Sequence, residues 1–348
     1  MKHKVALVAG DGIGPEISQA AREVVEAVGV AVEWIPTPVG KAALAAYGEE
    51  LPAESLQTMT SIGVVLKSPL IAERRSGGVT VRGRGDERHY PSVNNALRRE
   101  LGAYVNVRPV RGFAGVSGAY TRMDLVIMRE VTEDTYAGLE RAISPDRAEA
   151  TKLITRGATE RVTRYACEYA VKHARRTVSA IHKANVLHLT DGLFLEAARG
   201  IVAQYPALLF DDKMIDAACY LAVKQPALFD VMVMPNQYGD IFSDLAAGLV
   251  GSLGLAPGAN LGDDVAMFEA AHGAAPDIAG QGIANPIGLI LSAAMMLDHL
   301  GESDAAGRVR QGVALVLERG EVLPGDLGGQ ASTRELTAAI CKAMPVLK

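Results

Sequence analysis

Short apolar runs of strand length alternate along this chain with longer segments of helical periodicity, and this alternation limits the folds available to it. Strand-like runs occur at residues 5–9, 62–66, 125–128, 178–182, 208–210 and 229–234, and helical patterns occur at 15–28, 158–174, 191–204 and 212–223. Such alternation is typical of parallel sheets that are covered by helices. The sequence therefore predicts an α/β protein with a mainly parallel sheet. An almost wholly apolar helix at 286–300 is expected in a core or a subunit interface.

Length, charge and cysteine content exclude several classes of protein. The 348 residues suffice for two domains or one large α/β unit, and the net charge of −5 lacks the basic excess that nucleic-acid binding requires. No apolar run reaches membrane-spanning length, and we expect no signal or transit peptide before the first strand. Cys167, Cys219 and Cys341 form no CxxC pair. We therefore expect a cytoplasmic protein with reduced thiols, and neither nucleic acid nor a membrane as a partner.

The segment Gly10-Asp-Gly-Ile-Gly-Pro-Glu16 follows a strand and opens a helix, which is the place of a dinucleotide-binding fingerprint. Its glycines are spaced G-x-G-x-G rather than G-x-G-x-x-G, and no clear acidic residue closes a second strand about 20 residues further on. We therefore interpret it as a tight glycine turn at the floor of a cleft, with Pro15 in the first helical turn. A second glycine-rich segment, which also holds several arginines between residues 72 and 89, is predicted to be an irregular surface loop.

The stretch from Asn236 to Asp244 carries the strongest chemical signal in the chain. It lies where a strand-like run gives way to a helix, so Asp240 and Asp244, four residues apart, share one helical face. Their like charges repel unless a cation binds between them, and carboxylate oxygens suit Mg²⁺ or Mn²⁺. The alternative interpretation is a pair of acids that only complement the positive end of the helix dipole.

Several basic side chains stand beside apolar strands or helix edges. The guanidinium groups of Arg98, Arg108 and Arg129 could converge on a polyanionic substrate, although each alone is more often a surface ion-pair partner. Lys183 follows the strand-like run 178–182, a position where α/β proteins bind ligands, although a solvated lysine is the simpler interpretation of that residue alone. His272 lies in a glycine-rich loop that favours contact with a flat ligand, whereas in isolation it could be a packed core histidine.

Taken together, these motifs resemble from end to end those of the β-decarboxylating dehydrogenases, the family of isocitrate, homoisocitrate and 3-isopropylmalate dehydrogenases. The matching residues are Gly10-Asp-Gly-Ile-Gly-Pro-Glu16, Asn106-Val-Arg108-Pro109, Arg129-Glu130, Glu133-Asp134-Thr-Tyr136-Ala-Gly138, His182-Lys183-Ala-Asn185-Val186, Asn236 to Asp244, and His272-Gly273 to Asn285-Pro286. Because several independent motifs occur in one order along one chain, the chain is identified as a member of this family.

The resemblance implies a two-domain α/β subunit of the isocitrate/isopropylmalate dehydrogenase type, which is not a Rossmann fold. Residues 1–103 and 251–348 would build a large cofactor-binding domain, and 104–250 a small domain that holds a homodimer together. In such enzymes the two subunits share their active sites. Lys183 and Asp216 would therefore reach into the partner's site, and a monomer should be inactive.

Members of the family differ where they read the variable group of the substrate. Here Ser92 and Asn94 resemble the isocitrate pattern, in which both side chains hydrogen-bond the γ-carboxylate of this tricarboxylate. 3-Isopropylmalate enzymes present aliphatic residues and an acid there, and homoisocitrate enzymes a further arginine. An isopropyl group would leave the buried polar pair unpaired, at a cost of about 1–3 kcal/mol. Just upstream, residues 70–78 depart from the family's Thr-Thr-Pro-x-Gly pattern, so the other two substrates remain as alternatives.

The resemblance also bears on the cofactor. NADP-using relatives place Lys-Tyr where this chain has Asp277-Ile278, and an aspartate can accept hydrogen bonds from a ribose 2′-hydroxyl while repelling a 2′-phosphate. We therefore predict NAD. His272, Gly273 and Asn285 would surround its adenosine half, with Glu269 in the same loop.

The implied reaction is the oxidative decarboxylation of isocitrate to 2-oxoglutarate and CO₂. Asp240, Asp244 and the partner's Asp216 would hold Mg²⁺ or Mn²⁺. Arg98, Arg108 and Arg129 would clamp the substrate carboxylates, Lys183 would take the hydroxyl proton, and Tyr136 would protonate the carbon that loses CO₂. A different class of protein, the weakly catalytic regulatory subunit of a hetero-oligomeric isocitrate dehydrogenase, is the remaining alternative.

Overall fold

The computed structural model describes residues 2–71, 78–82 and 87–345, and the chain forms two compact units. Unit 1 contains Met1–Gly102, Arg111–Arg122 and Ala247–Lys348, and unit 2 contains Ala103–Val110 and Met123–Ala246. The segment Arg111–Arg122 thus lies in unit 1, whereas the predicted small domain included it. Close backbone approaches explain this placement, because a Cβ on Gly115 would lie 2.1 Å from the carbonyl oxygen of Leu317, and one on Gly118 would lie 2.6 Å from that of Val250.

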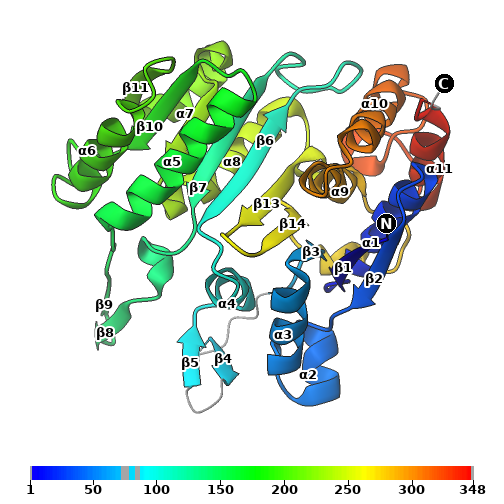
Figure 1. Ribbon diagram of the computed structural model, residues 1–348, viewed down its shortest axis with the longest axis horizontal. Helices are drawn as coiled ribbons and strands as arrows, with labels where there is room; N and C mark the ends of the chain where they lie inside the picture. Colours follow the sequence, from blue (N-terminus) through cyan, green and yellow to red (C-terminus); the bar gives the residue numbers. More distant parts are fainter. Residues whose placement is uncertain (1, 72–77, 83–86, 346–348) are drawn as a thin grey trace. The chain divides into compact units, whose positions relative to one another are not determined.

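The sheet of unit 1 brings together strands from both ends of the chain. Its strand order is β13-β14-β3-β1-β2, and these strands span His3–Val8 (β1), Val32–Pro36 (β2), Val64–Lys67 (β3), Pro257–Leu261 (β13) and Ala266–Ala270 (β14). All neighbours in this order pair in parallel except β13 and β14. The two ends of the sequence are therefore joined in one sheet, as Figure 1 shows by the blue strands β1–β3 and the yellow strands β13 and β14.

Helices complete the core of unit 1. They are α1 (Gly14–Ala27), α2 (Lys41–Tyr47), α3 (Ala53–Ile62), α4 (Val93–Glu100), α9 (Ile287–His299), α10 (Ser303–Arg319) and α11 (Thr333–Ala343). The predicted apolar helix is α9, and it is central to the core. All of its leucine and isoleucine side chains are buried, and the helix packs against α1 and α10. α11 begins with a capping box in which Ser332 and Glu335 satisfy each other's backbone N–H groups.

Unit 2 confirms the predicted strand–helix alternation. Its strand order is β11-β10-β12-β7-β6, with strands at Val105–Arg111 (β6), Asp124–Glu130 (β7), Thr177–His182 (β10), Leu209–Met214 (β11) and Val231–Met234 (β12). Its helices are α5 (Arg156–Lys172), α6 (Thr190–Val202), α7 (Ile215–Lys224) and α8 (Asn236–Val250). In Figure 1 helix α5 crosses the near face of these strands and α8 lies behind them. The helix predicted at 212–223 begins later, at Ile215, because β11 continues to Met214.

The glycine turn has the conformation that its composition predicts. Gly10 and Gly12 have φ of +75° and +60°, and a Cβ on Gly12 would lie 2.0 Å from the carbonyl oxygen of Ala274. Only glycine fits such a position. The turn therefore lies tightly against the loop that holds His272, and Pro15 stands in the first turn of α1 as predicted.

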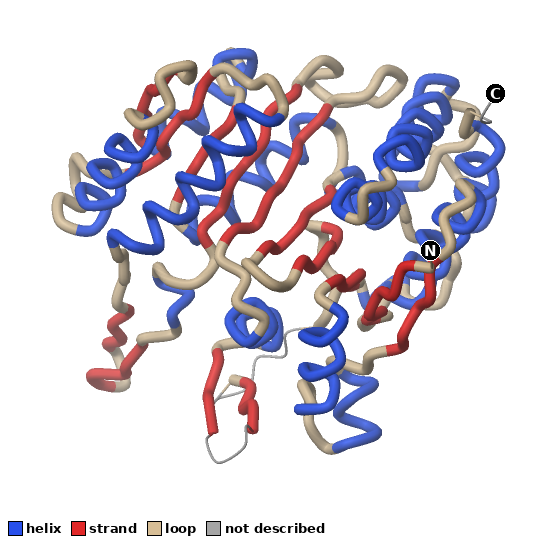
Figure 2. The backbone as a smooth tube through the Cα atoms, viewed as in Figure 1, coloured by secondary structure: helices blue, strands red, loops and turns tan. Residues whose placement is uncertain are grey.

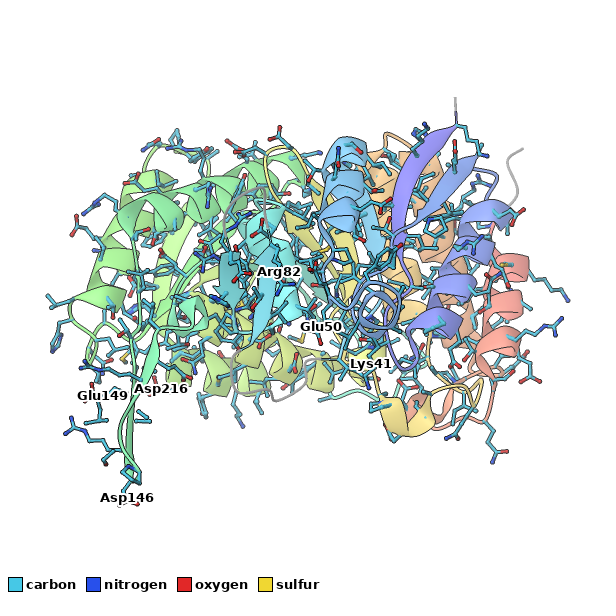
Figure 3. All side chains as sticks on the ribbon, turned by 90° about the horizontal axis from the view of Figure 1, so that it is seen from below. Lys41, Glu50, Arg82, Asp146, Glu149 and Asp216 are labelled. Carbon is cyan, nitrogen blue, oxygen red and sulfur yellow. The ribbon has the colours of Figure 1, made fainter. Side chains whose placement is uncertain are left out.

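Two hairpins depart from the sequence prediction. Within the segment predicted as an irregular loop, β4 (Val79–Arg82) and β5 (Glu87–Tyr90) pair antiparallel. Val81 and Tyr90 are buried while their neighbours in the two strands are not, so the hairpin has one apolar face that packs on the core. The rest of that loop, 72–77 and 83–86, lies outside the described residues. The second hairpin, β8 (Glu140–Ser144) and β9 (Arg147–Ala150), projects from unit 2 in both viewing directions, with Asp146 at its tip (Figures 2 and 3).

None of the helices in the described part of the chain is long and apolar enough to cross a membrane. The three cysteines are free thiols, and Cys167 is buried in α5, where burial raises its pKa to about 12. Cys219 and Cys341 are partly buried.

Candidate active site

Helix α8 starts directly after β12, so its first turns lie at the carboxyl end of that strand. This is the edge of an α/β sheet where ligands usually bind. Asp240 and Asp244 stand one helical turn apart on α8, and their side chains are 38% and 56% exposed. The predicted carboxylate pair is therefore accessible from solvent on one side.

Arg129, at the end of β7, binds both α8 and the tyrosine turn. Its side chain is 1% exposed, its Nε and Nη2 donate to Asn236 Oδ1 at 2.9 and 2.7 Å, and its Nη1 donates to Asp240. Tyr136, in the 3₁₀ turn Thr135–Ala137, donates its hydroxyl to Asp240 Oδ2 at 2.6 Å, and its ring centre lies 5.2 Å from the Arg129 guanidinium carbon. Asp240 thus joins the predicted proton donor and a predicted substrate clamp.

Arg108, on β6, bridges the two carboxylates of α8. Its Nη2 lies 3.5 Å from Asp240 and its Nη1 lies 3.7 Å from Asp244. Asn106 and Ser243 orient the same guanidinium, since Nε donates to Asn106 Oδ1 at 2.6 Å and Nη1 donates to Ser243 Oγ. Two arginines and two carboxylates therefore form one compact cluster in unit 2.

Gly239 makes this cluster possible. A Cβ at Gly239 would lie 2.5 Å from Cγ of Arg129 and 2.7 Å from its Cβ. These atoms belong to the part of a buried side chain that cannot move away without displacing the guanidinium. The glycine before Asp240 is thus required for the close approach of β7 and α8.

The donor set at the carboxylates fits a hard divalent cation. Burial raises the pKa of Asp244, and the neighbouring charge of Asp240 adds to this, while Arg108 opposes it. A cation between the two carboxylates would relieve that like-charge repulsion. Two carboxylates are an incomplete set, and the described residues contain no group of three or more His, Cys, Asp and Glu side chains that could hold a metal ion. The third predicted ligand, Asp216, therefore does not join Asp240 and Asp244 within one chain.

Lys183 and Asp216 form a second pair in unit 2. Lys183 follows β10, and its Nζ donates to Asp216 Oδ1, in the first turn of α7, at 2.6 Å. The hydrogen bond from Lys183 lowers the pKa of the exposed Asp216 carboxyl. Asp216, labelled in Figure 3, has a side chain that is 65% exposed. Both predicted residues that should serve a partner's site are thus paired and accessible to a second chain.

In unit 1, Arg98 is held by an internal network. It donates from Nε to Asn260 Oδ1 at 2.9 Å and from Nη2 to Glu269 Oε1 at 3.2 Å, and Lys67 binds the other Glu269 oxygen. Burial opposes ionisation of Glu269, but Lys67 and Arg98 outweigh it and hold its pKa well below the ordinary value. Glu269 lies on strand β14, not in the His272 loop as predicted, because its backbone completes the pairing of β14 with β13 and β3.

The predicted substrate-reading residues stand at the start of α4. Ser92 caps the helix by accepting the N–H of Asn95 at 3.3 Å. Asn94 is in the first turn, and its Oδ1 is buried without a hydrogen-bond partner among the described residues. The helix N-terminus and the two polar side chains make a setting that favours an anion.

The predicted cofactor residues lie in the loop that follows β14. Burial lowers the pKa of His272, whose Nε2 is buried without a hydrogen-bond partner in the described part of the chain. Asp277 and Ile278 belong to the 3₁₀ turn Pro276–Ile278, with Asp277 exposed, and Gly273 is exposed as well. The side chain of Asn285 makes two hydrogen bonds within unit 1. Its Nδ2 donates to Asp326 Oδ2 at 3.0 Å, and its Oδ1 accepts the N–H of Ile287, also at 3.0 Å.

Several residues that shape these sites had no individual predicted role. Asn236 and Ser243 orient the arginines, and Lys67 and Asn260 hold Glu269. Asn236 could have been found, since it is a polar residue directly after a buried strand. Lys67 and Asn260 gave no such signal, because each lies at or within an apolar strand whose pairing only the tertiary structure shows.

Arg129, Tyr136 and the carboxylate pair of α8 lie at or just after the carboxyl ends of β7 and β12, where α/β enzymes usually bind their ligands. The chain belongs to the isocitrate/isopropylmalate dehydrogenase family, whose sequence profile matches residues 4–340. These are decarboxylating dehydrogenases, and members use NAD and a divalent metal with small-molecule substrates. The predicted family and fold are thereby confirmed.

Individual relatives carry two different names. The chain is 45% identical over 336 residues to the mitochondrial NAD isocitrate dehydrogenase catalytic subunit 5 of Arabidopsis thaliana. The matched region covers 96% of this chain and 87% of that relative. It is 42% identical over 341 residues to the 3-isopropylmalate dehydrogenase of Archaeoglobus fulgidus, with 98% and 99% covered. The crystal structure of isocitrate dehydrogenase from Methylococcus capsulatus superposes with a TM-score of 0.92 at 44% identity, covering 98% of this chain and 99% of that one.

Proposed function

We propose that this chain catalyses the NAD-dependent oxidative decarboxylation of isocitrate to 2-oxoglutarate and CO₂. The observation that carries the choice of substrate is the polar start of α4. There the amide of Asn94 and the helix N-terminus offer hydrogen bonds to a γ-carboxylate, and the Ser92 hydroxyl, which donates to Asn95 Oδ1 at 3.3 Å, would turn to the same carboxylate. The Asn94 amide would present its Nδ2–H₂ group to that carboxylate by turning over, which its shape permits. Similarity to NAD isocitrate dehydrogenase subunits supports the same choice.

The second candidate is 3-isopropylmalate, which the relative from Archaeoglobus fulgidus favours. NADH formation by the purified chain with Mg²⁺ separates the two, and homoisocitrate and NADP⁺ complete the comparison. We expect isocitrate with NAD⁺ to give the largest kcat/KM. We also expect Asn94→Leu to lower kcat/KM for isocitrate by about tenfold to a hundredfold, because a hydrogen bond to a charged group is lost, while 3-isopropylmalate is not disfavoured. A wild-type preference for 3-isopropylmalate would reject isocitrate as the substrate.

Each predicted site residue has a proposed part in the reaction. Arg108 and Arg129 bind substrate carboxylates together with Arg98. Lys183 of a second copy accepts the proton of the substrate hydroxyl as C2 is oxidised, and Tyr136 donates a proton to the carbon that has lost CO₂. Asp240, Asp244 and the partner's Asp216 would hold Mg²⁺ or Mn²⁺, which would supply positive charge to stabilise developing negative charge, and bound NAD would supply the hydride acceptor. His272, Gly273, Asp277, Ile278 and Asn285 are the proposed cofactor contacts, and Glu269 acts through Arg98.

We propose a homodimer that shares its active sites. The β8–β9 hairpin supports this, since an isolated two-stranded ribbon is at best marginally stable in water. Exposed apolar side chains of unit 2 support it too, among them Leu189 at 88%, Tyr220 at 63% and Ile241 at 59%. Mixed dimers provide the test. A hybrid of Tyr136→Phe and Lys183→Met chains should recover about half of the wild-type activity, since one of its two sites is intact, whereas a site within one chain predicts none.

Activity of the purified chain by itself distinguishes a catalytic from a regulatory subunit. We propose a catalytic one, because Tyr136, Lys183, Asp216, Asp240 and Asp244 are all present. A cytoplasmic location rests only on the free thiols. The Arabidopsis relative is named mitochondrial and lends it no support.

A further inference from the structure

A buried charged cluster in unit 2 lies beside the proposed catalytic residues and has no part in the scheme above. The side chain of Lys152 is 13% exposed, and its ammonium lies 3.0 Å from Asp191 Oδ1 and 3.5 Å from Asp134 Oδ1. Both carboxylates are fully buried. The same ammonium lies 4.2 Å from the centre of the Tyr238 ring. One lysine therefore balances two carboxylates that have been removed from water.

Asp134 fixes the turn that carries Tyr136. Its Oδ1 accepts the N–H of Thr135 at 2.8 Å, and its Oδ2 accepts the N–H of Gln237, in the first turn of α8, at 2.9 Å. Asp134 has a φ of +72°, a conformation that is strained for a residue other than glycine. The surrounding bonds must offset that strain. The Asp134 side chain thus ties the Tyr136 turn to the helix that carries Asp240.

Asp191 fixes the backbone at Lys183. Its Oδ2 accepts the N–H of Lys183 at 2.6 Å and the hydroxyl of Tyr238 at 3.0 Å. Asp191 belongs to the first turn of α6, so it closes the connection between β10 and α6 from which the Lys183 side chain projects. The position of Lys183 therefore depends on a carboxylate that is itself held by Lys152.

We propose that Lys152 is a positioning residue that holds Tyr136 and Lys183 in place together, through Asp134 and Asp191. This inference rests on the proposed roles of Tyr136 and Lys183. In the proposed dimer Tyr136 acts in its own subunit's site and Lys183 in the other, so one ammonium group fixes one half of each active site. Without it, two buried carboxylates lack their cation, and segments bonded to uncompensated charges open towards water.

Hydrogen exchange tests the inference without any reference to activity. In Lys152→Met, we expect the amides of Lys183, Thr135 and Gln237 to exchange about tenfold faster or more, because a lost bridge of roughly 1.4 kcal/mol opens them tenfold more often. The matched control is Arg175→Met. Arg175 also bridges two aspartates of unit 2, Asp124 and Asp230, but at the amino ends of the strands. It should leave those three amides unchanged, and equal exchange in both variants would overturn the inference.

Kinetics separate positioning from general loss of stability. We expect Lys152→Met to lower kcat by about tenfold to a hundredfold while KM changes less than about twofold, since misplaced groups affect the transition state most. Lys152→Arg should restore most of kcat because it keeps the charge. If Lys152→Met does not fold, Lys152→Gln replaces it in both measurements. A variant that changes KM alone, or an Arg variant as slow as Met, would contradict positioning.

The mixed dimer shows whether both sites depend on Lys152. In the hybrid of Tyr136→Phe and Lys183→Met chains, the one intact site uses Lys183 of the first chain and Tyr136 of the second. Placing Lys152→Met in either chain should slow that site, and slowing from one chain only would refute the double role. If the wild-type protein oxidises neither isocitrate, homoisocitrate nor 3-isopropylmalate, the proposed function is rejected. The exchange experiment would still decide the role of Lys152.

Discussion

Tyr136 and Asp240 share a hydrogen bond of 2.6 Å, so the proposed proton donor is held by a carboxylate that is also a proposed metal ligand. The other oxygen of Asp240 binds Arg129 and faces Arg108. The tyrosine hydroxyl is thereby fixed in direction beside the positive charges that would bind the substrate carboxylates. This arrangement makes separate predictions for the tyrosine, the helix, the carboxylates and the turn around them.

Replacing Tyr136 by phenylalanine removes the proton donor and keeps the ring against Arg129. We expect kcat to fall by about a hundredfold or more, while KM stays within about twofold, because general acid catalysis acts in the transition state. Steady-state kinetics measure both constants. Tyr47→Phe is the control, since Tyr47 is 54% exposed in α2 and should behave as wild type. An unchanged kcat in Tyr136→Phe would remove this residue from the mechanism.

Two glycines of α8 should respond oppositely to alanine. Gly239→Ala places a methyl group 2.5 Å from Arg129 Cγ, so the guanidinium must move and KM should rise about tenfold as a charged hydrogen bond to the substrate weakens. At Gly248 no atom of the described residues outside the helix lies within 4 Å of the added Cβ. Gly248→Ala should stabilise the protein by up to about 1 kcal/mol without changing KM. Similar kinetics in both variants would show that Arg129 tolerates the contact.

The carboxylate pair of α8 should bind Mn²⁺ measurably, and electron paramagnetic resonance of free Mn²⁺ gives its affinity. Asp240→Asn and Asp244→Asn remove one charged ligand each, and we expect affinity to drop by about tenfold to a hundredfold. Asp230→Asn, which alters an aspartate paired with Arg175 at the amino ends of the strands, is the control and should bind Mn²⁺ as wild type does. Equal affinities in all three variants would place the ion elsewhere.

Glu133 should make stability depend on pH. Burial raises its pKa to about 7, with Glu130 and Asp134 adding to the shift, although Thr155 donates two hydrogen bonds to the carboxylate. The folded protein therefore binds more protons than the unfolded chain between about pH 4.5 and pH 7. Its stability falls as pH rises through this range.

Glu133→Gln removes this titration while keeping the shape of the side chain. The free energy of unfolding of the variant relative to wild type should increase from pH 5.5 to pH 8, and urea denaturation at both values measures it. Glu149→Gln, on the exposed β9 strand, is the control. A constant difference between Glu133→Gln and wild type at the two pH values would show that Glu133 does not titrate in this range.

Much of the fold could be predicted from local sequence, and the strands that could not be predicted are those with few apolar residues. Strands β7, β10 and β12 of unit 2 were predictable because they are runs of apolar residues separated by helical patterns, whereas β6 and the β8–β9 hairpin were not predicted. Strand β13, Pro257–Leu261, was not, since a sequence of Pro-Gly-Ala-Asn-Leu has little strand propensity and is a strand only because it pairs with β14. The β4–β5 hairpin was missed for a similar reason, as its apolar face consists of few residues among glycines and arginines.

The sequence by itself determined the family and the two carboxylates of α8, because motifs and helical spacing are properties of neighbouring residues. Only the tertiary structure decided which groups meet. Arg129 and Asp240 are 111 positions apart, and Arg98 and Glu269 are 171 apart, so their contacts depend on how strands and helices pack. The same holds for Lys152, which looks like an ordinary surface lysine until the fold places two buried carboxylates beside it.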